Sequence, residues 1–554
     1  MKNVLLILLA SCLTTTFLFA QATFNTIDSV DINNINASVL VHGDMWRYPN
    51  NPIIPDCKFP NGSNKNLHRL GSIWLSGYDG TGNLHIAAQT YRWVNDYWPG
   101  PLDASDTLNY ATSSSWAKIW KVNLTDIETF LSFPIHTTTN TPQSILTWPG
   151  KGNINATGNS GTPLTITSDM APFVDLNGNG IYEPLLGEYP EIKGNQTLWW
   201  VFSDNGPTHN QTNGRPLGVE VHAMAYAFKR GTLIDNVVYY EYTIVNKSAY
   251  NYSNFRIAQW DDIQIGYSYP FEDFIGYDSI WRMAVDYSGT NCNGCTTGDT
   301  VNNYGANPPQ TALTMIVLPG DAGTSYVPAG SFDYYVNDAS IIGNPANDSE
   351  YDNYMRAKLR NSQHFTDDFS GAASPCNGYG MGANVNYLFT GDPSNYSQWS
   401  DCSCNNNPGD RRTVFSSNDF NLNAGSSQRV VFALLVADTA KGCPLASFND
   451  IKIVADTAWG NYFQNASGIK NIINNIGVNI YPNPTHNLLY LENSVPNTGE
   501  ENTTFYNIIG QKLNVPISGT GNKRVADLSG LPNGIYLVVY NDGTIQKTVK
   551  VIKE

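Results

Sequence analysis

Short segments in which apolar and polar residues alternate dominate the chain, and turns rich in Gly, Asn, Pro and Asp separate them. Such alternation is typical of β-strands, because successive side chains point to opposite faces of a sheet. Residues 218–228 and 237–246 both alternate around a turn at 229–235, and they predict a long antiparallel hairpin. One face of its first strand carries Val219, Val221, Ala223, Ala225 and Ala227, and the other carries Glu220, His222, Met224, Tyr226 and Phe228.

Helical patterns are few. Residues 125–128, Thr-Asp-Ile-Glu, have the sequence of a capping box and predict a short helix. Apolar residues at helical spacing predict a second helix over 351–359, and Pro444 predicts the start of a third. The third helix would bury Phe448, Ile451, Ala455, Trp459 and Phe463. Because strands and helices do not alternate, we expect a mainly β fold of antiparallel β-sandwich domains with a few short helices.

The N-terminus has the pattern of an export signal. Lys2, the apolar run 4–10 and the small residue Ala20 predict a signal peptide over residues 1–20. In an alternative interpretation, residues 9–12 form a lipoprotein signal in which Cys12 is acylated. No other stretch is long and apolar enough to predict a membrane helix, so we expect none in the mature chain.

The C-terminal residues 476–554 predict a separate module. Short alternating strands are interrupted by turns of Pro, Gly and Asn, which is typical of a small Ig-like β-sandwich. The polar, Asn-rich stretch 466–475 predicts a linker between this module and a β-rich body over residues 21–465. A boundary near 160–215 would divide that body into two subdomains.

Three motifs of the module stand in a family-specific order: Tyr-Pro-Asn-Pro at 481–484, residues 506–512, and Gly-Ile-Tyr-Leu at 534–537. They resemble the type A C-terminal sorting domain of cargo proteins of the type IX (Por) secretion system. The resemblance implies Sec export, recognition by the type IX machinery, and a secreted or extracellular protein that is often anchored to surface lipopolysaccharide. Residues 84–102, 171–202, 259–278 and 410–438 also resemble an uncharacterised family of large type IX cargo proteins, which implies no activity.

The net charge of the chain limits the classes of partner that it can bind. The chain has 47 acidic and 31 basic side chains, which gives a formal charge of −16. This negative balance argues against binding to nucleic acid or to anionic membrane surfaces. Charged residues are only 14% of the chain, so most of its polar surface comes from uncharged side chains.

One loop has the spacing of a calcium site. Its oxygen-bearing ligands at loop positions 1, 3, 5, 7 and 9 would be Asp175, Asn177, Asn179, the Ile181 carbonyl and Glu183. Position 12 is Leu186, so the usual bidentate carboxylate is missing, and Glu183 or Glu188 would replace it. We expect a structural Ca²⁺ with a Kd of about 10⁻⁴–10⁻³ M. The alternative is an Asn-Gly turn held by its own hydrogen bonds.

A second acidic group, Asp261, Asp262, Asp273 and Asp278, has three open interpretations: a metal site, a catalytic carboxylate pair, or a solvated loop. Glu220 and Glu241 form another formal pair on neighbouring predicted strands. His222 stands alone on its strand, which favours a structural role. No catalytic motif is recognisable, so the catalytic residues of any enzyme here are unknown, and no organic cofactor is indicated.

Disulfides are expected in an exported chain. Seven cysteines remain after the predicted signal peptide: Cys57, Cys292, Cys295, Cys376, Cys402, Cys404 and Cys443. Their odd number predicts at least one free thiol or an intermolecular bond. A zinc site built from Cys292, Cys295, Cys402 and Cys404 is the alternative.

These patterns favour a non-enzymatic surface protein that contacts other cells, matrix or glycans. Aromatic residues make up 12% of the chain, and any Trp or Tyr exposed on a β-face could stack on sugar rings. The alternative function is a secreted hydrolase that acts on polysaccharide or protein, with carboxylates from the 261–278 region as candidates.

Overall fold

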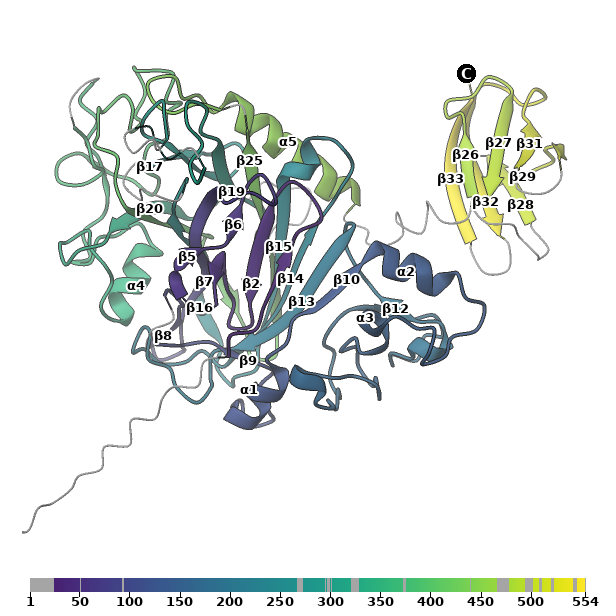
Figure 1. Cartoon of the computed structure of the whole chain (residues 1–554), viewed down its shortest axis with the longest axis horizontal. Coiled ribbons are helices and arrows are strands. Elements are labelled where there is room, and N and C mark those ends of the chain that lie inside the picture. The colour runs from purple at the N-terminus through teal and green to yellow at the C-terminus, as the bar shows by residue number, and fades with distance from the viewer. Residues whose placement is uncertain are drawn as a thin grey trace, which may run out of the picture.

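The computed structural model describes residues 24–49, 51–91, 94–266, 273–293, 295, 299, 301–319, 328–371, 375–438, 440–465, 478–493, 502–507, 511–519, 523–541 and 546–553. The predicted signal peptide with Cys12 and the predicted linker 466–475 lie outside these residues. Strands dominate the fold, all named strand pairs are antiparallel, and the helices are few, which confirms the predicted fold class (Figure 1).

The body is built on two large sheets. The first has ten strands, in the order β1-β2-β3-β7-β16-β23-β20, with β6, β8 and β24 paired beside this path. Its strands are β1 (Ile27–Val30), β2 (Asn36–Leu40), β3 (Asp44–Met45), β6 (Cys57–Lys58), β7 (Asn66–Tyr78), β8 (Leu84–Ala87), β16 (Tyr252–Ile263), β20 (Ser331–Val336), β23 (Arg411–Ser416) and β24 (Phe420–Leu422).

The second sheet has nine strands, in the order β10-β13-β14-β15-β25-β19-β18-β17, with β9 paired to β13. Its strands are β9 (Trp98–Pro99), β10 (Trp120–Asn123), β13 (Gln196–Ser203), β14 (Val219–Ala227), β15 (Val237–Asn246), β17 (Asp273–Asp278), β18 (Met283–Ser288), β19 (Gln310–Val317) and β25 (Ser427–Ala437). Three small two-stranded sheets pair β4 (Arg47–Tyr48) with β5 (Asn51–Pro55), β11 (Phe173–Val174) with β12 (Tyr189–Pro190), and β21 (Thr366–Asp367) with β22 (Ala383–Asn384).

Two hydrophobic cores flank the second sheet. The first core fills the space between the sheets, where Trp46 donates to Tyr240 of β15 at 2.8 Å, and it continues onto the other face of the first sheet, where Trp74 packs on Trp260 and Tyr351. The second core lies on the opposite face of the second sheet, under the helices and loops that cover it. The body is therefore a two-sheet sandwich with further segments over its outer faces, and the second sheet lies between the two cores.

The predicted hairpin is β14 and β15, and its alternation assigns side chains to the two cores. Val221 and Ala223 face the first core, whereas Met224 and Tyr226 face the second. Both faces of this sheet are covered, so neighbouring Trp199 and Trp200 are both buried, in different cores. Six of the described tryptophans, Trp98, Trp116, Trp120, Trp148, Trp199 and Trp200, are buried, so they do not form an exposed aromatic face.

A helix forms in each of the three expected places, but the second covers Asp348–Tyr354 instead of 351–359, and the third begins at Asn449 instead of at Pro444. The helices are α1 (Tyr110–Trp116), α2 (Leu124–Leu131), α3 (Gln143–Leu146), α4 (Asp348–Tyr354) and α5 (Asn449–Asn465), and the 3₁₀ turns are η1 (Asn159–Gly161), η2 (Pro184–Leu186) and η3 (Leu233–Asn236). The capping box of α2 uses Asn123 and Asp126, two residues earlier than predicted. Helix α5 begins at Asn449 and packs on β25, and Phe463 is half exposed instead of buried (Figure 1).

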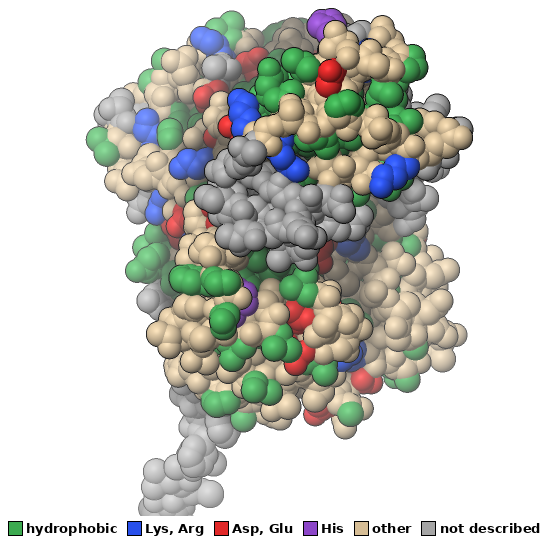
Figure 2. All heavy atoms as spheres, turned by 90° about the vertical axis from the view of Figure 1, so that its right-hand side faces the viewer, with side chains coloured by type: hydrophobic (Ala, Val, Ile, Leu, Met, Phe, Trp, Pro, Cys, Tyr) green, Lys and Arg blue, Asp and Glu red, His purple; other side chains and the backbone are tan. Residues whose placement is uncertain are grey.

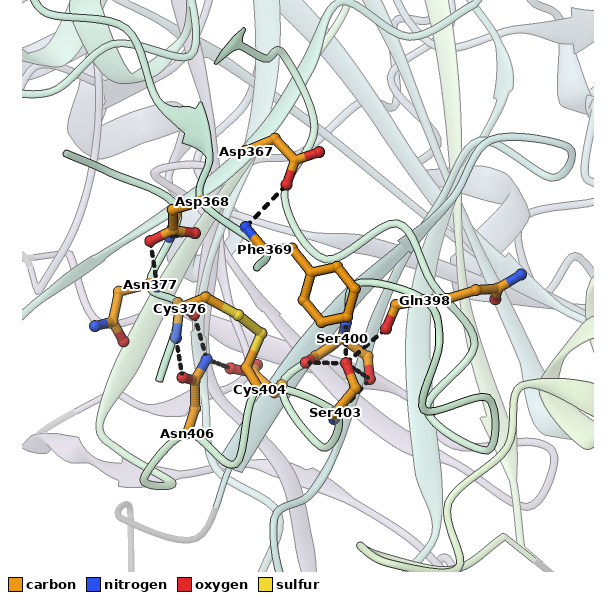
Figure 3. Close-up of a disulfide and its surroundings, with 12 residues drawn as sticks. Asp367, Asp368, Phe369, Cys376, Asn377, Gln398, Ser400, Ser403, Cys404 and Asn406 are labelled. Atoms are coloured by element: carbon orange, nitrogen blue, oxygen red, sulfur yellow. Dashed lines mark hydrogen bonds between the residues drawn. A yellow bond between two sulfur atoms is a disulfide. The ribbon is translucent and has the colours of Figure 1, made fainter. Parts of the chain in front are cut away.

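Three disulfides form among the described residues: Cys292–Cys295, Cys376–Cys404 and Cys402–Cys443. This pairing replaces the alternative zinc site, because Cys402 and Cys404 bond to different partners. Cys57 is a free, buried thiol, as the odd number of cysteines predicts. Around the Cys376–Cys404 bridge, Asn406 accepts the backbone N–H of Cys376 and donates its side-chain N–H to the Cys376 carbonyl, which fixes the loop (Figure 3).

The C-terminal module is a β-sandwich with a core of its own (Figure 1). One sheet contains β26 (Val478–Tyr481), β27 (Leu488–Asn493), β31 (Lys523–Asp527) and β30 (Ile517–Ser518), and the other contains β29 (Lys512–Leu513), β28 (Asn502–Asn507), β32 (Gly534–Asn541) and β33 (Gln546–Lys553). Side chains from both sheets meet in the core: Leu489, Leu491, Phe505, Ala526, Leu528, Val538, Tyr540 and Val551. The module therefore has the hydrophobic interior that an independently folding unit needs.

Candidate functional site

A groove of about 570 Å³ lies on the outer face of the second sheet. Its floor comes from alternate residues of β13, β14 and β15, among them Trp199, Glu220, His222, Glu241 and Thr243. The segments 168–172 and 191–193 form its wall and contribute Ser168, Asp169, Met170, Pro172, Glu191 and Lys193. The groove is therefore lined by both polar and apolar side chains, and its hydrogen-bonding groups come from the strands and from the loops beside them.

His222 and Glu220 form a close pair in this groove. His222 Nε2 lies 2.6 Å from Glu220 Oε1, and the Leu102 N–H donates to Glu220 Oε2 at 3.0 Å. The Glu220 side chain is 3% exposed and that of His222 is 15% exposed. A carboxylate can only accept here, so a neutral His222 carries its proton on Nε2 and its lone pair on Nδ1. The pair is suited to holding a polar ligand or to moving a proton.

Glu241 and its basic neighbours form a second polar group in the groove. Lys193 Nζ lies 2.6 Å from Glu241 Oε2, and Arg429 Nη1 lies 3.5 Å from Glu241 Oε1. Glu220 and Glu241 thus reach one groove, but each has its own partner. The pairing neutralises much of the charge, so the groove suits a polar, weakly charged ligand better than a polyanion.

The structure brings the oxygen side chains of the predicted calcium loop together. Asp175 accepts the N–H groups of Gly178 and Gly180, both at 2.7 Å. Asn177 and Asn179 donate their side-chain amides to Glu183 Oε2 at 3.0 and 2.6 Å. The backbone N–H of Gly180, followed by that of Gly178, lowers the pKa of Asp175, so this side chain is a carboxylate at neutral pH.

Glu188 closes the base of this loop. Its carboxyl accepts the N–H groups of Leu176 at 3.2 Å and of Glu183 at 2.8 Å. Burial is the main cause that raises the pKa of Glu188. Leu186 is exposed, as expected for a position that supplies no ligand, and Ile181 is half exposed. The donor set consists of oxygens alone, which fits the preference of Ca²⁺.

The second acidic group does not form one site. Asp261 and Asp262 are both fully buried and point to opposite faces of β16, where Asp261 meets His68 and Asp262 meets Tyr91. Asp273 is buried on β17. Asp278 binds Lys452 of α5 at 3.1 Å. The interpretation as a solvated acidic loop is therefore wrong, because three of the four side chains are buried, and strand geometry turns the neighbours Asp261 and Asp262 away from each other.

The sequence alone could not show that Lys193 and residues 168–172 lie beside the groove over β14 and β15. The signal that was available is the row of polar residues on one face of an otherwise apolar strand, Glu220 and His222 on β14. On a strand that is buried on both faces, polar side chains of this kind mark a local opening in its cover.

Charged groups elsewhere on the protein are dispersed. Among the described atoms on the face drawn in Figure 2, acidic and basic side chains are scattered among uncharged polar ones, with no extended basic area. No described helix combines the length and apolarity that are needed to cross a membrane.

The C-terminal module matches a known family. Residues 479–554 match the secretion system C-terminal sorting domain. No curated protein matches the chain. Among solved structures, a polysaccharide lyase aligns over 69% of this chain and 38% of its own, at 8% identity and a TM-score of 0.18. This chain thus spans well under half the length of that structure, and the likeness is too low to carry an argument.

Residues 479–554 therefore form a secretion system C-terminal sorting domain. The chain is a cargo protein of the type IX secretion system, and it is delivered to the cell surface or to the medium.

Proposed function

We propose that this exported protein makes non-enzymatic contacts with glycans outside the cell, as an adhesion or matrix protein, and that the groove over β13–β15 holds the glycan. The observation that carries the proposal is the groove itself, where His222 and Glu241 on the strands and Lys193 on the segment 191–193 present hydrogen-bonding groups. Ligand sites commonly combine apolar surface with a few convergent polar groups, and this groove has both. If the protein is anchored to the cell surface after export, surface lipopolysaccharide is a candidate partner.

Binding to neutral polysaccharides tests this proposal. We expect Lys193→Met to lower the affinity about 10-fold or more, because a hydrogen bond to a charged group contributes about 1.5–3 kcal/mol. Lys452→Met, which removes a charge on α5 outside the groove, is the matched control and should bind normally. Titration calorimetry or affinity electrophoresis of the full chain against a polysaccharide panel measures the effect. Equal affinities for the two variants would contradict the assignment of the groove.

A secreted hydrolase is the second candidate, and the His222–Glu220 pair is the observation that favours it. An imidazole oriented by a carboxylate is the arrangement that general bases use. The same polysaccharide panel separates the two functions, since new reducing ends that disappear in His222→Gln would establish turnover. Polysaccharides that bind to the protein without being cleaved would support the non-enzymatic function.

We also propose that the loop 175–183 binds a structural Ca²⁺ through Asp175, Asn177, Asn179, the Ile181 carbonyl and Glu183, with Glu188 supporting its base. We expect EDTA to lower the melting temperature of the protein and added calcium to restore it. In Asp175→Ala this difference should vanish, whereas Asp169→Ala, which removes an exposed carboxylate in the preceding loop, should keep it. Differential scanning fluorimetry measures the shift, and identical curves for the native protein with and without EDTA would refute calcium binding.

A further inference from the structure

Three potential metal ligands from both sheets meet in the interior of the body. His68 lies on β7, Asp261 on β16 and Asp286 on β18, and one ligand atom of each lies within 4.8 Å of the others. The exposed fractions of the three residues are 0%, 0% and 2%. The cluster therefore spans the interface between the first and second sheets and is closed off from solvent.

Hydrogen bonds satisfy only part of the two carboxyl groups in this cluster: Asp261 binds His68 through Oδ2, and Asp261 and Asp286 hydrogen-bond to each other. Asp261 Oδ1 and Asp286 Oδ1 have no hydrogen-bond partner among the described residues. Two buried carboxyls without a compensating cation are costly, and a bound cation is one of the few ways to stabilise them.

His68 is oriented as a metal ligand would be. Nδ1 lies 2.7 Å from Asp261 Oδ2, and Nε2 lies 2.8 Å from the Thr311 hydroxyl on β19. When Nε2 donates its proton to Thr311, the lone pair of Nδ1 faces the carboxyl of Asp261. A histidine ligand is commonly oriented in this way by a hydrogen bond at its other nitrogen.

We propose that His68, Asp261 and Asp286 bind a divalent transition-metal ion of the Zn²⁺ class, which links the two sheets of the body. One imidazole nitrogen with carboxylate oxygens is a donor set that Zn²⁺ accepts, and Zn²⁺ binds nitrogen ligands more tightly than Mn²⁺ or Fe²⁺ does. Ca²⁺ fits poorly, because it takes six to eight oxygen ligands. The site is separate from the surface loop 175–183 and does not depend on the glycan proposal.

Metal loading during refolding tests the site, because a chelator cannot reach a buried ion in the folded protein. The full chain is unfolded in denaturant with EDTA, refolded with or without Zn²⁺, dialysed, and assayed for bound metal and melting temperature. We expect about one Zn²⁺ per chain and a higher melting temperature after refolding with the ion. His68→Gln and Asp286→Asn should lose both effects.

Two variants serve as controls. Asp262→Asn disturbs a buried carboxylate on the opposite face of β16, and Asp175→Ala removes the candidate calcium ligand, so both should keep the zinc. Where a ligand variant fails to refold, the chain without substitutions is refolded with Co²⁺ instead of Zn²⁺, and we expect a visible absorption typical of mixed nitrogen and oxygen coordination. Two results would overturn the proposal. The first is a chain that takes up no Zn²⁺ or Co²⁺ during refolding, which would mean that the two carboxyls share a proton. The second is zinc uptake that persists in both ligand variants.

Discussion

A chain that lacks residues 476–554 accumulates in the periplasm instead of reaching the cell surface or the medium. The sorting domain has its own core, formed by residues 489–551, and the two cores of the body contain no residue of it. Truncation therefore removes the export signal and leaves the body able to fold. Cell fractionation and protease accessibility of the body measure the result, which we expect to be a loss of nearly all surface display.

The matched control is a chain whose body is disturbed while the sorting domain is left whole. His222→Gln changes the groove only, and we expect it to be exported normally. Tryptophan fluorescence of the truncated chain, recovered from the periplasm, should report a folded body. Surface display of the truncated chain would contradict the role of the domain.

Asp401→Ala lowers the free energy of unfolding by about 3–5 kcal/mol, because it leaves a buried guanidinium without its partner. Arg411 Nη1 and Nη2 bind the two oxygens of Asp401 at 2.6 and 3.0 Å, and the two side chains are 4% and 0% exposed. Asp401 also accepts the N–H of Ile275 at 3.1 Å and the side-chain N–H of Asn406 at 2.7 Å. One substitution thus removes four hydrogen bonds beside the Cys402–Cys443 bridge.

Urea unfolding followed by tryptophan fluorescence measures the loss. Lys151→Ala is the control, because the Lys151–Asp169 pair at 3.0 Å is an exposed one whose removal should cost at most about 1 kcal/mol. A double variant, Asp401→Ala with Arg411→Met, should recover part of the stability, since it removes the unpaired charge. If Asp401→Ala and Lys151→Ala unfolded at the same urea concentration, the buried pair would not have the stabilising role assigned to it.

Local patterns predicted the elements of the fold well. Alternation in β14 and β15 and the apolar spacing in α5 depend on neighbours in sequence, and the structure confirms these elements. The short motifs of the sorting domain were equally informative, because they belong to turns and strand ends that are local. The cap of α2 shifted by two residues, since both Asn123 and Thr125 can cap a helix and only the packed structure selects one.

The candidate sites depend on contacts that are distant in sequence. The spacing of Asp261, Asp262, Asp273 and Asp278 suggested one cluster, yet adjacent residues of a strand point in opposite directions. His68 comes close to Asp261 only because β7 pairs with β16, and Asp286 reaches them only because the two sheets stack. Cys402 and Cys443 pair although they are 41 residues apart in the sequence. None of these contacts has a signature in a single sequence.

The central position of the second sheet has a consequence for engineering. A shift of β14 by one residue would turn Val221 into the groove and His222 into the first core. Pairing with the neighbouring strands strongly opposes such a shift. Positions 220 and 222, together with 241 and 243 on β15, can therefore be randomised in a library while the backbone that presents them stays fixed. The scaffold lends itself to selection of new ligand preferences, and its own export domain would carry each selected variant out of the cell.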